Sequence, residues 1–383
     1  GKLMWVFAVV VILAAGTILG QEYPLRFSGT STLDINGIGV FRIAQETPWV
    51  AIALALAYHS IRAPVSAIAR PRGVLVAVLL VTLMLLTGAG LLLTAPSITA
   101  PDFNIDAGLP NVFPLLFLVV SGGAISGVYA LIVTGTTVRQ VEQSQHAPTI
   151  SYGSVMLDGV LAALLVVVLS AGFATTGEWS TMYGQWPVKA EIFSWLDLAV
   201  TKLGRFVAST GIPMPIAIGI VASTVAAMAL TMLENSLRAL SFGVEEFVED
   251  FDLENLKGNR LRQRIAVGIV IFATICLLQV DLGVDHWLFF GLANQLFAGC
   301  FMLVLSLIVL RSSSGTLFVL LPALFVLGCA SWGLVWLVID WWQKEEWILF
   351  IMTCVVGAAA ITSAFACTGA LLKVRQHNTP TPP

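Results

Sequence analysis

Charged residues are scarce in this sequence of 383 residues: Asp, Glu, Lys and Arg make up 11% of it, against about 25% in soluble domains. Hydrophobic residues make up 58% of the chain, which is more apolar surface than one soluble core can hold. This composition excludes an ordinary soluble enzyme, a nucleic-acid-binding protein and a disordered tail. The net charge of −3 is also too small to indicate a strongly acidic or basic partner.

Cysteine is scarce as well, and the sequence lacks the spacing of metal ligands. The five cysteines lie in apolar runs without a CxxC or Cys/His pattern, so we expect free thiols that pack in the interior. A nucleophile elbow, a HExxH zinc motif and a phosphate-binding loop are also missing. The sequence therefore predicts no enzymatic activity, no cofactor and no metal site, and it leaves a polytopic membrane protein as the class.

Apolar runs long enough to span a bilayer recur along the chain. A bilayer core about 30 Å thick needs roughly 20 apolar residues in a helix, which predicts an all-α membrane helix bundle of about ten spans. Lys and Arg gather in alternate loops, and this pattern places both termini in the cytoplasm. The predicted spans are 4–20, 48–62, 73–94, 112–136, 153–174, 213–240, 265–281, 287–310, 315–339 and 347–372.

The predicted topology divides the chain into four parts. Residues 1–240 form a transmembrane bundle of spans one to six, and residues 265–372 contain spans seven to ten. Between them, the segment 241–264 is predicted to be a cytoplasmic, acidic and amphipathic helix. The polar end, 373–383, is predicted to be a disordered cytoplasmic tail.

The fourth predicted span contains a cluster of small residues, with Gly122, Gly123, Ser126 and Gly127 close together. Such residues let another helix backbone approach closely, as in GxxxG packing. They are also typical of a broken helix whose exposed backbone groups surround a substrate or an ion. The spacing alone leaves both interpretations open.

Ionisable side chains within predicted spans are costly and therefore informative. Asp158 lies about one turn into the fifth predicted span, where it can bind a cation, carry a proton or pair with a neighbouring Arg at the interface. Glu234 and Arg238 are four residues apart, so they lie on one helical face and can pair. That pair is either a static contact at the cytoplasmic edge or a gate that breaks during transport.

Two adjacent amides, Asn294 and Gln295, follow Gly291 in the apolar eighth predicted span. Amides in an apolar helix need hydrogen-bond partners. We expect them either to bond another helix or to contact polar groups of a substrate.

These segments resemble the carbon starvation protein (CstA) family of bacterial inner-membrane transporters. The densest match is NVFPLLFLVVSGGAISGVYALIVTGTTVRQ (111–140), similar to the family's P-x-L-F-I-T-I-A-C-G-A-I-S-G-F-H-x-L-x-x-S-G-T-T-x-K. ISYGSVMLDGVLA (150–162) is similar to I-G-Y-G-x-M-L-x-E, and ALTMLENSLRAL (229–240) to L-T-T-L-D-x-x-T-R. WLFFGLANQLFAG (287–299) is similar to W-P-L-F-G-x-A-N-Q-x-L-A. A weaker match, APVSAIARPRGVLVAVLL (63–80), is similar to L-P-V-W-x-L-L-x-P-R-D-Y.

The chain departs from the family pattern at several functional positions. Tyr129 stands where the family has His, which removes a group that titrates near neutral pH. Asp158 and Glu234 stand where the family has Glu and Asp, so both carboxylates keep their charge. Arg72-Gly73-Val74 replaces the family's Arg-Asp-Tyr.

The resemblance implies uptake of small nutrients, either peptides or pyruvate-like carboxylates, across the bacterial inner membrane during carbon limitation, driven by protons or another cation. It also implies kinship with LeuT-like transporters, whose sites lie at broken helices. In this interpretation, Asp158 is the coupling carboxylate, and Glu234 with Arg238 is an inner gate. The predicted substrate-binding residues are Ser121, Gly122, Gly123, Ser126, Gly127, Tyr129, Asn294 and Gln295.

An alternative is a membrane scaffold subunit without transport activity of its own. The Gly-Pro-rich N-terminal portion of the family is absent from this sequence, so we expect a fragment or one half of a split transporter. A partner chain would then supply the missing helices. The predicted partners are the lipid bilayer, a small solute, a proton or other cation and such a chain, but no nucleic acid.

Overall fold

The protein is an all-α polytopic membrane protein, in which seven helices are long and apolar enough to cross a bilayer within the described part of the chain. The structure is a computed structural model. It describes residues 16, 19–20, 31–34, 40–43, 47–63, 68–102, 112–135, 137–183, 192–250, 259–278, 286–312 and 317–377. The seven candidate spans are Ala69–Thr94, Val112–Thr134, Ser144–Ala171, Met214–Val244, Trp287–Leu310, Leu317–Gln343 and Trp347–Gly369.

These helices correspond to seven of the ten predicted spans. The predicted first span, 4–20, lies almost entirely outside the described residues. The predicted second span forms α2 (Thr47–Arg62), which has 16 residues. The predicted seventh overlaps α10 (Asn259–Leu278), whose shorter apolar stretch is Ile265–Ile275. The count of ten spans therefore stays a prediction.

The chain forms two compact units, each of which contains two separate stretches of sequence. Unit 1 consists of residues 1–107 and 139–279, and unit 2 of residues 108–138 and 280–383. The predicted boundaries at residues 240 and 265 concern membrane topology, and they stay a prediction. The helix α9 (Met214–Asp250) passes through the first of these boundaries without a break.

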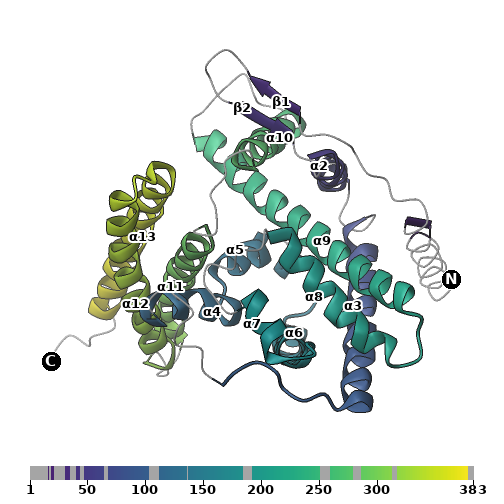
Figure 1. Ribbon diagram of the computed structural model, residues 1–383. Helices are drawn as coiled ribbons and strands as arrows, with labels where there is room; N and C mark the ends of the chain where they lie inside the picture. Colours follow the sequence, from purple (N-terminus) through teal and green to yellow (C-terminus); the bar gives the residue numbers. More distant parts are fainter. Residues whose placement is uncertain are drawn as a thin grey trace. The chain divides into compact units, whose positions relative to one another are not determined.

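In unit 1, α3 (Ala69–Thr94) and α8 (Ile192–Ala208) pack against α9 and against the end of α6 (Ala147–Ala171) (Figure 1). The apolar face of α8 supplies Leu203, Phe206 and Val207, whose spacing places them on one side of the helix. At Gly90, α3 approaches α8 so closely that a Cβ atom would lie 1.9 Å from the carbonyl oxygen of Phe206. Only glycine allows the two helices to meet at this distance.

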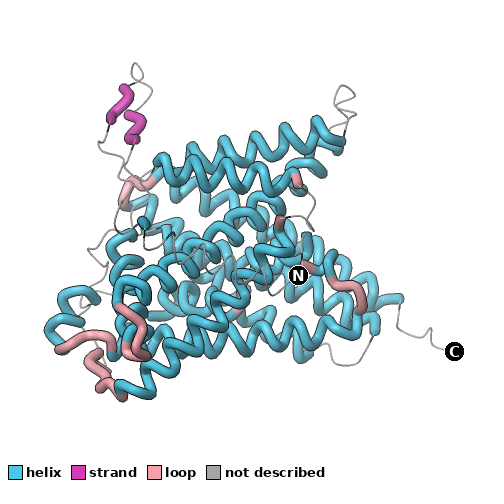
Figure 2. Tube along the Cα trace, turned by 90° about the vertical axis from the view of Figure 1, so that its right-hand side faces the viewer, coloured by secondary structure: helices cyan, strands magenta, loops and turns pink. Residues whose placement is uncertain are grey.

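A second apolar cluster of unit 1 joins α2, α9 and α10. It consists of Leu54, Ala57, Ile61, Leu237, Val267 and Val270. Before α2, the strands β1 (Ser31–Asp34) and β2 (Val40–Ile43) form a short antiparallel ribbon in which Ser31 lies opposite Ile43. Figure 2 shows that helices otherwise dominate the described chain.

A buried lysine connects α8 to the short helix α7 (Thr176–Tyr183). The side chain of Lys202 is only 2% exposed. Its Nζ donates a hydrogen bond to Glu178 (2.8 Å) and lies 3.9 Å from the ring centre of Phe173. Glu178 Oε2 also accepts a hydrogen bond from the Ala174 N–H, so this one carboxylate holds the start of α7 against α8.

The contact between Glu178 and Lys202 should weaken as the pH falls. The hydrogen bond from Lys202, followed by that from the Ala174 N–H, holds the pKa of Glu178 below its ordinary value. A carboxyl with a lowered pKa stabilises the fold above its unfolded pKa and loses that contribution as the pH falls through its folded pKa. Glu178→Gln should therefore lower Tm at pH 7, and its difference from wild type should shrink below about pH 4. The exposed Glu142→Gln is the control, and thermal unfolding across pH is the measurement.

In unit 2, α11 (His286–Ser312) packs against α12 (Leu317–Gln343) and α13 (Trp347–His377), and it is the most buried of the seven candidate spans (Figure 1). Leu288, Leu292 and Leu296 recur every fourth residue along its inner face, and they belong to the same buried cluster as the fully buried Trp341.

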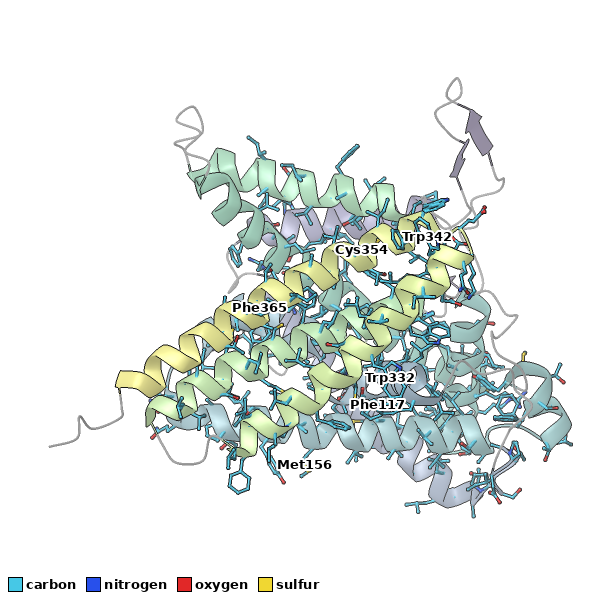
Figure 3. All side chains as sticks on the ribbon, turned by 90° about the vertical axis from the view of Figure 1, so that its left-hand side faces the viewer. Phe117, Met156, Trp332, Trp342, Cys354 and Phe365 are labelled. Carbon is cyan, nitrogen blue, oxygen red and sulfur yellow. The ribbon has the colours of Figure 1, made fainter. Side chains whose placement is uncertain are left out.

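An aromatic cluster on the same unit lies at the beginning of the candidate span Val112–Thr134. The Phe113 ring lies 5.4 Å from that of Trp332, and the Phe117 ring lies 6.0 Å from that of Phe325. Figure 3 labels Phe117 and Trp332 of this cluster, and also the exposed Phe365 on α13. Large apolar side chains that face outward along a span are typical of a lipid-exposed surface.

Candidate functional site: a helix break and a buried ion-pair cluster

The Gly-rich predicted span is a broken helix in unit 2. The helix α4 (Phe117–Ala124) ends before Ile125, whose backbone is extended (φ −130°, ψ 104°), and α5 (Gly127–Gly135) begins two residues later. Glycine and β-branched residues weaken a helix, and the Ser126 Oγ caps the new one by accepting a hydrogen bond from the Tyr129 N–H (3.1 Å). The local sequence therefore favours an end and a restart at this point.

Asn294 of α11 bonds both sides of the break. Its Nδ2 donates to the carbonyl oxygen of Gly122 at the end of α4 (2.9 Å). Its Oδ1 accepts hydrogen bonds from the Ser126 hydroxyl (2.9 Å) and from the Val128 N–H at the start of α5 (3.0 Å). The side chain thus replaces hydrogen bonds that an unbroken helix would make within its own backbone.

Gln295 provides a fourth bond to the same break, because its Nε2 donates to the carbonyl oxygen of Ile125 (3.0 Å). Both amide residues are 1% exposed. Of the two predicted partners for these amides, another helix and a substrate, the structure shows the first. The amides bond a broken helix, and unpaired backbone groups in a membrane are costly enough to require this.

The small residues of this segment also allow close packing. The structure therefore contains both a close helix contact and a helix break, and binding of a substrate or an ion at the break stays a prediction. A Cβ at Gly127 would lie 2.1 Å from the Ala298 nitrogen, which is inside the van der Waals distance. A Cβ at Gly291 would lie 3.0 Å from Val119. Gly123, in contrast, has open space where a Cβ would be.

One side of the break is open. Gly123, Ala124, Ile125 and Tyr129 are exposed, whereas Gly127 is buried against α11. Within the described residues, no hydrogen bond to the carbonyl oxygen of Gly123 or Ala124 is found. The C-terminal carbonyls of α4 and the N-terminal end of α5 therefore present partial charges of opposite sign at one place, an arrangement that can bind a polar solute or an ion.

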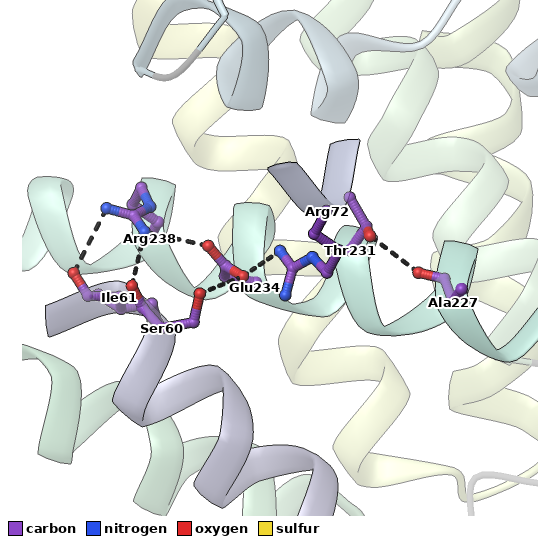
Figure 4. Close-up of polar contacts among 7 residues, drawn as sticks. All are labelled: Ser60, Ile61, Arg72, Ala227, Thr231, Glu234 and Arg238. Carbon is purple, nitrogen blue, oxygen red and sulfur yellow. Dashed lines mark hydrogen bonds and ion pairs between the residues drawn. The ribbon is translucent and has the colours of Figure 1, made fainter. Parts of the chain in front are cut away.

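The predicted pair of Glu234 and Arg238 is present in unit 1, where it belongs to a larger buried cluster (Figure 4). Arg238 Nη2 lies 3.0 Å from Glu234 Oε1, and the Glu234 side chain is fully buried. The Ser60 hydroxyl donates to Glu234 Oε2 (2.6 Å), and the Arg72 guanidinium forms a second ion pair with the same oxygen. Arg238 also donates to the carbonyl oxygens of Ser60 (3.1 Å) and Ile61 (3.3 Å) at the end of α2.

Sequence reasoning missed Ser60 and Arg72 as members of this cluster. The i,i+4 spacing indicates only contacts within α9, whereas Ser60 and Arg72 come from α2 and α3. The available signal for Arg72 was its place in the weaker family match, where the family also has Arg.

Asp158 lies near the midpoint of α6, so its predicted position one turn from the helix start is wrong. The helix begins at Ala147 rather than at residue 153, which places Asp158 about 16 Å along it. Asp158 is exposed in unit 1, and no ion pair of it is found within the described residues. It therefore belongs to a different unit from the helix break between α4 and α5, which lies in unit 2.

A family model described as "Carbon starvation protein CstA" matches residues 1–185 and 187–333. The chain belongs to the carbon starvation protein CstA family. It is 27% identical to the peptide transporter CstA of Campylobacter jejuni over 343 residues, which cover 75% of this chain and 48% of that protein. It is 21% identical to the peptide transporter CstA of Bacillus subtilis over 374 residues, which cover 84% and 61% of the two chains.

A member with another named substrate also matches. The pyruvate/proton symporter BtsT of Escherichia coli is 29% identical over 132 residues, which cover 33% of this chain and 18% of the symporter. The chain spans about half the length of the CstA relative from C. jejuni. No solved structure matches the chain, so the LeuT-like kinship stays a prediction.

Proposed function

We propose that this CstA-family chain transports small nutrients, either peptides or pyruvate-like carboxylates, across the bacterial inner membrane during carbon limitation. The names of its relatives, peptide transporters and a pyruvate/proton symporter, support this class of solute. The observation that carries the proposal is the helix break in unit 2, because an opening in an apolar helix is costly unless its exposed backbone groups serve a function.

The solute would bind at the open side of the break. Ser121, Gly122, Gly123 and Ser126 would supply the polar lining there, and Gly127 would bring the start of α5 against α11 beside it. Tyr129 is exposed beside the start of α5, where its ring would limit which solutes fit. Asn294 and Gln295 would act mainly by keeping the break open, since their described hydrogen bonds go to its backbone and to the Ser126 hydroxyl.

Substitution of Asn294 tests this site. Asn294→Ala removes three partly buried hydrogen bonds and leaves the Gly122 carbonyl oxygen and the Val128 N–H without the partner that Asn294 supplies, at a cost of up to about 1–3 kcal/mol each. We expect uptake of radiolabelled alanyl-alanine or pyruvate by proteoliposomes to fall at least about tenfold. The control is Gln145→Ala, which removes an exposed amide outside unit 2.

Uptake by Asn294→Ala at the wild-type rate would contradict a role of the break in transport. If the wild-type chain carries neither solute and copurifies with another membrane protein, the scaffold alternative is favoured instead.

We propose Asp158 as the group that couples uptake to protons or another cation. A carboxylate at the middle of an apolar helix is costly when it faces lipid, so such residues usually face a functional partner or a wet cavity. Asp158→Asn should abolish uptake driven by a proton gradient while leaving membrane insertion unchanged. Asp158→Glu, which introduces the residue of the family pattern, should retain it. Gradient-driven uptake by the Asn variant at the wild-type rate would exclude this role.

The Glu234–Arg238 pair is proposed as the inner gate, with both termini of the chain in the cytoplasm. Arg238 joins α9 to the end of α2 through carbonyl oxygens as well as through Glu234. Movement of α2 away from α9 would therefore break several polar contacts together, and this favours two discrete states over gradual opening.

A further inference from the structure

The buried ammonium group of Lys202 in unit 1 depends on a single carboxylate. Its Nζ carries three N–H donors, of which one donates to Glu178 Oε1 (2.8 Å). The nitrogen also lies over the ring of Phe173, and no second hydrogen bond of it is found among the described residues. Because a buried charge that loses its counterion is destabilising, Lys202 requires a carboxylate at the position that Glu178 occupies.

The carboxylate that meets this requirement belongs to an element with little buried surface. The Glu178 side chain is 42% exposed, and no residue of α7 is buried. The other hydrogen bonds of Glu178, with the Ala174 N–H and the Thr175 hydroxyl, stay within α7 and the residues just before it. The Tyr183 ring contacts that of Phe173, with 5.9 Å between the ring centres. Since elements with few buried contacts open locally at low cost, α7 is the part of this contact that can move.

The other sides of Lys202 are fixed by the core of unit 1. Its neighbour Leu203 on α8, together with Phe206, belongs to the apolar cluster of that unit. Its stem lies against Gly172, where an added Cβ would be 3.4 Å from the Lys202 Cβ. Phe173 is buried just after the end of α6. None of these groups belongs to α7, so the ammonium would keep its place when α7 moves away.

We propose that Lys202 binds the carboxylate of a small organic acid, which replaces Glu178 while α7 moves away as a lid. The exchange keeps the buried charge paired, because one carboxylate takes the place of another and accepts the same charge-assisted hydrogen bond. The hydrogen bond from Lys202 is the main cause of the lowered pKa of Glu178, and the charge of exposed Arg205 contributes to it, so both cations favour an anion at this position. The site lies in unit 1, and it would bind a carboxylate whether or not the chain transports one.

Isothermal titration calorimetry of the full chain in neutral detergent tests the site. Wild type should bind propionate but not propionamide, which has nearly the same shape without the charge. Glu178→Gln should bind propionate about fivefold more tightly, because the competing internal carboxylate is gone and the open state is more populated. Lys202→Met should lose binding but still fold, since an apolar side chain of similar length replaces a buried charge. Arg205→Met is the matched control: it removes an exposed cation one turn along α8 and should keep the affinity within about twofold.

Hydrogen exchange followed by mass spectrometry tests the movement of α7. Amide exchange over residues 174–183 should become faster when propionate binds wild type, and it should already be fast in Glu178→Gln without the ligand. Equal exchange with and without bound propionate contradicts the lid. The site itself is contradicted if neither wild type nor Glu178→Gln binds propionate, if Glu178→Gln binds it more weakly than wild type, or if Lys202→Met binds it as wild type does. These measurements use no gradient, so they do not depend on solute uptake at the helix break.

Discussion

Glu234→Gln is expected to destabilise unit 1 by about 3–5 kcal/mol, because it removes the carboxylate that the buried Arg238 shares with the mostly buried Arg72. The Gln side chain has nearly the same size, so packing is retained and the loss is electrostatic. Glu234 is fully buried and Arg238 nearly so, so water has little access to solvate the charge left on Arg238.

The measurement is chemical unfolding of the purified protein in micelles, with Glu142→Gln as a control for loss of an exposed carboxylate. A double variant tests whether the loss of stability comes from the unpaired charges rather than from altered packing. Adding Arg72→Gln to Glu234→Gln removes one of the two uncompensated cations, and it should restore part of the lost stability. If Glu234→Gln is no less stable than Glu142→Gln, the cluster is solvated and cannot act as a sealed gate.

Of the two ion pairs in this cluster, the sequence could predict Glu234–Arg238 but not Glu234–Arg72. The first pair follows from helix geometry, since residues four apart lie on the same face whatever surrounds them. The second joins α9 to α3, so it depends on which helices become neighbours. A single sequence contains no direct signal for that packing.

The same limit applies to the helix break. Its small residues and the two amides of α11 were predicted as parts of a site, because polar groups in apolar helices need partners. Which backbone groups Asn294 bonds could not be predicted, since Gly122 and Val128 meet it only once α4, α5 and α11 have packed.

One local error has a physical cause. The start of α6 was predicted too late because polar residues occupy its first turns, yet the hydroxyls of Ser151 and Ser154 donate to carbonyl oxygens within the helix and remain compatible with it. The burial of Lys202 could not be predicted, since a charge usually indicates exposure. An acidic partner and an aromatic ring allow its burial.

Gly127→Ala is expected to have the largest effect of any substitution at the helix break. The added Cβ would lie 2.1 Å from the nitrogen of Ala298 and 2.5 Å from the carbonyl carbon of Phe297. Both are backbone atoms of α11, so no side chain can rotate away and α5 must move as a whole. Overpacking alone costs about 1–3 kcal/mol, and the movement also breaks the hydrogen bonds from Ser126 and Val128 to Asn294.

We expect Gly127→Ala to lower uptake of labelled dipeptide or pyruvate by about 100-fold, because displacement of about 1 Å at a binding site can cost that much. Gly328→Ala is the matched control: the same methyl group is added on α12 of unit 2, where there is open space, and Ala also favours the helix. Uptake and Tm of this control should stay near wild type. If the two variants lose uptake equally, the solute path does not depend on the contact of α5 with α11. A loss confined to Gly127→Ala, together with a lower Tm, attributes transport to the close contact of α5 with α11.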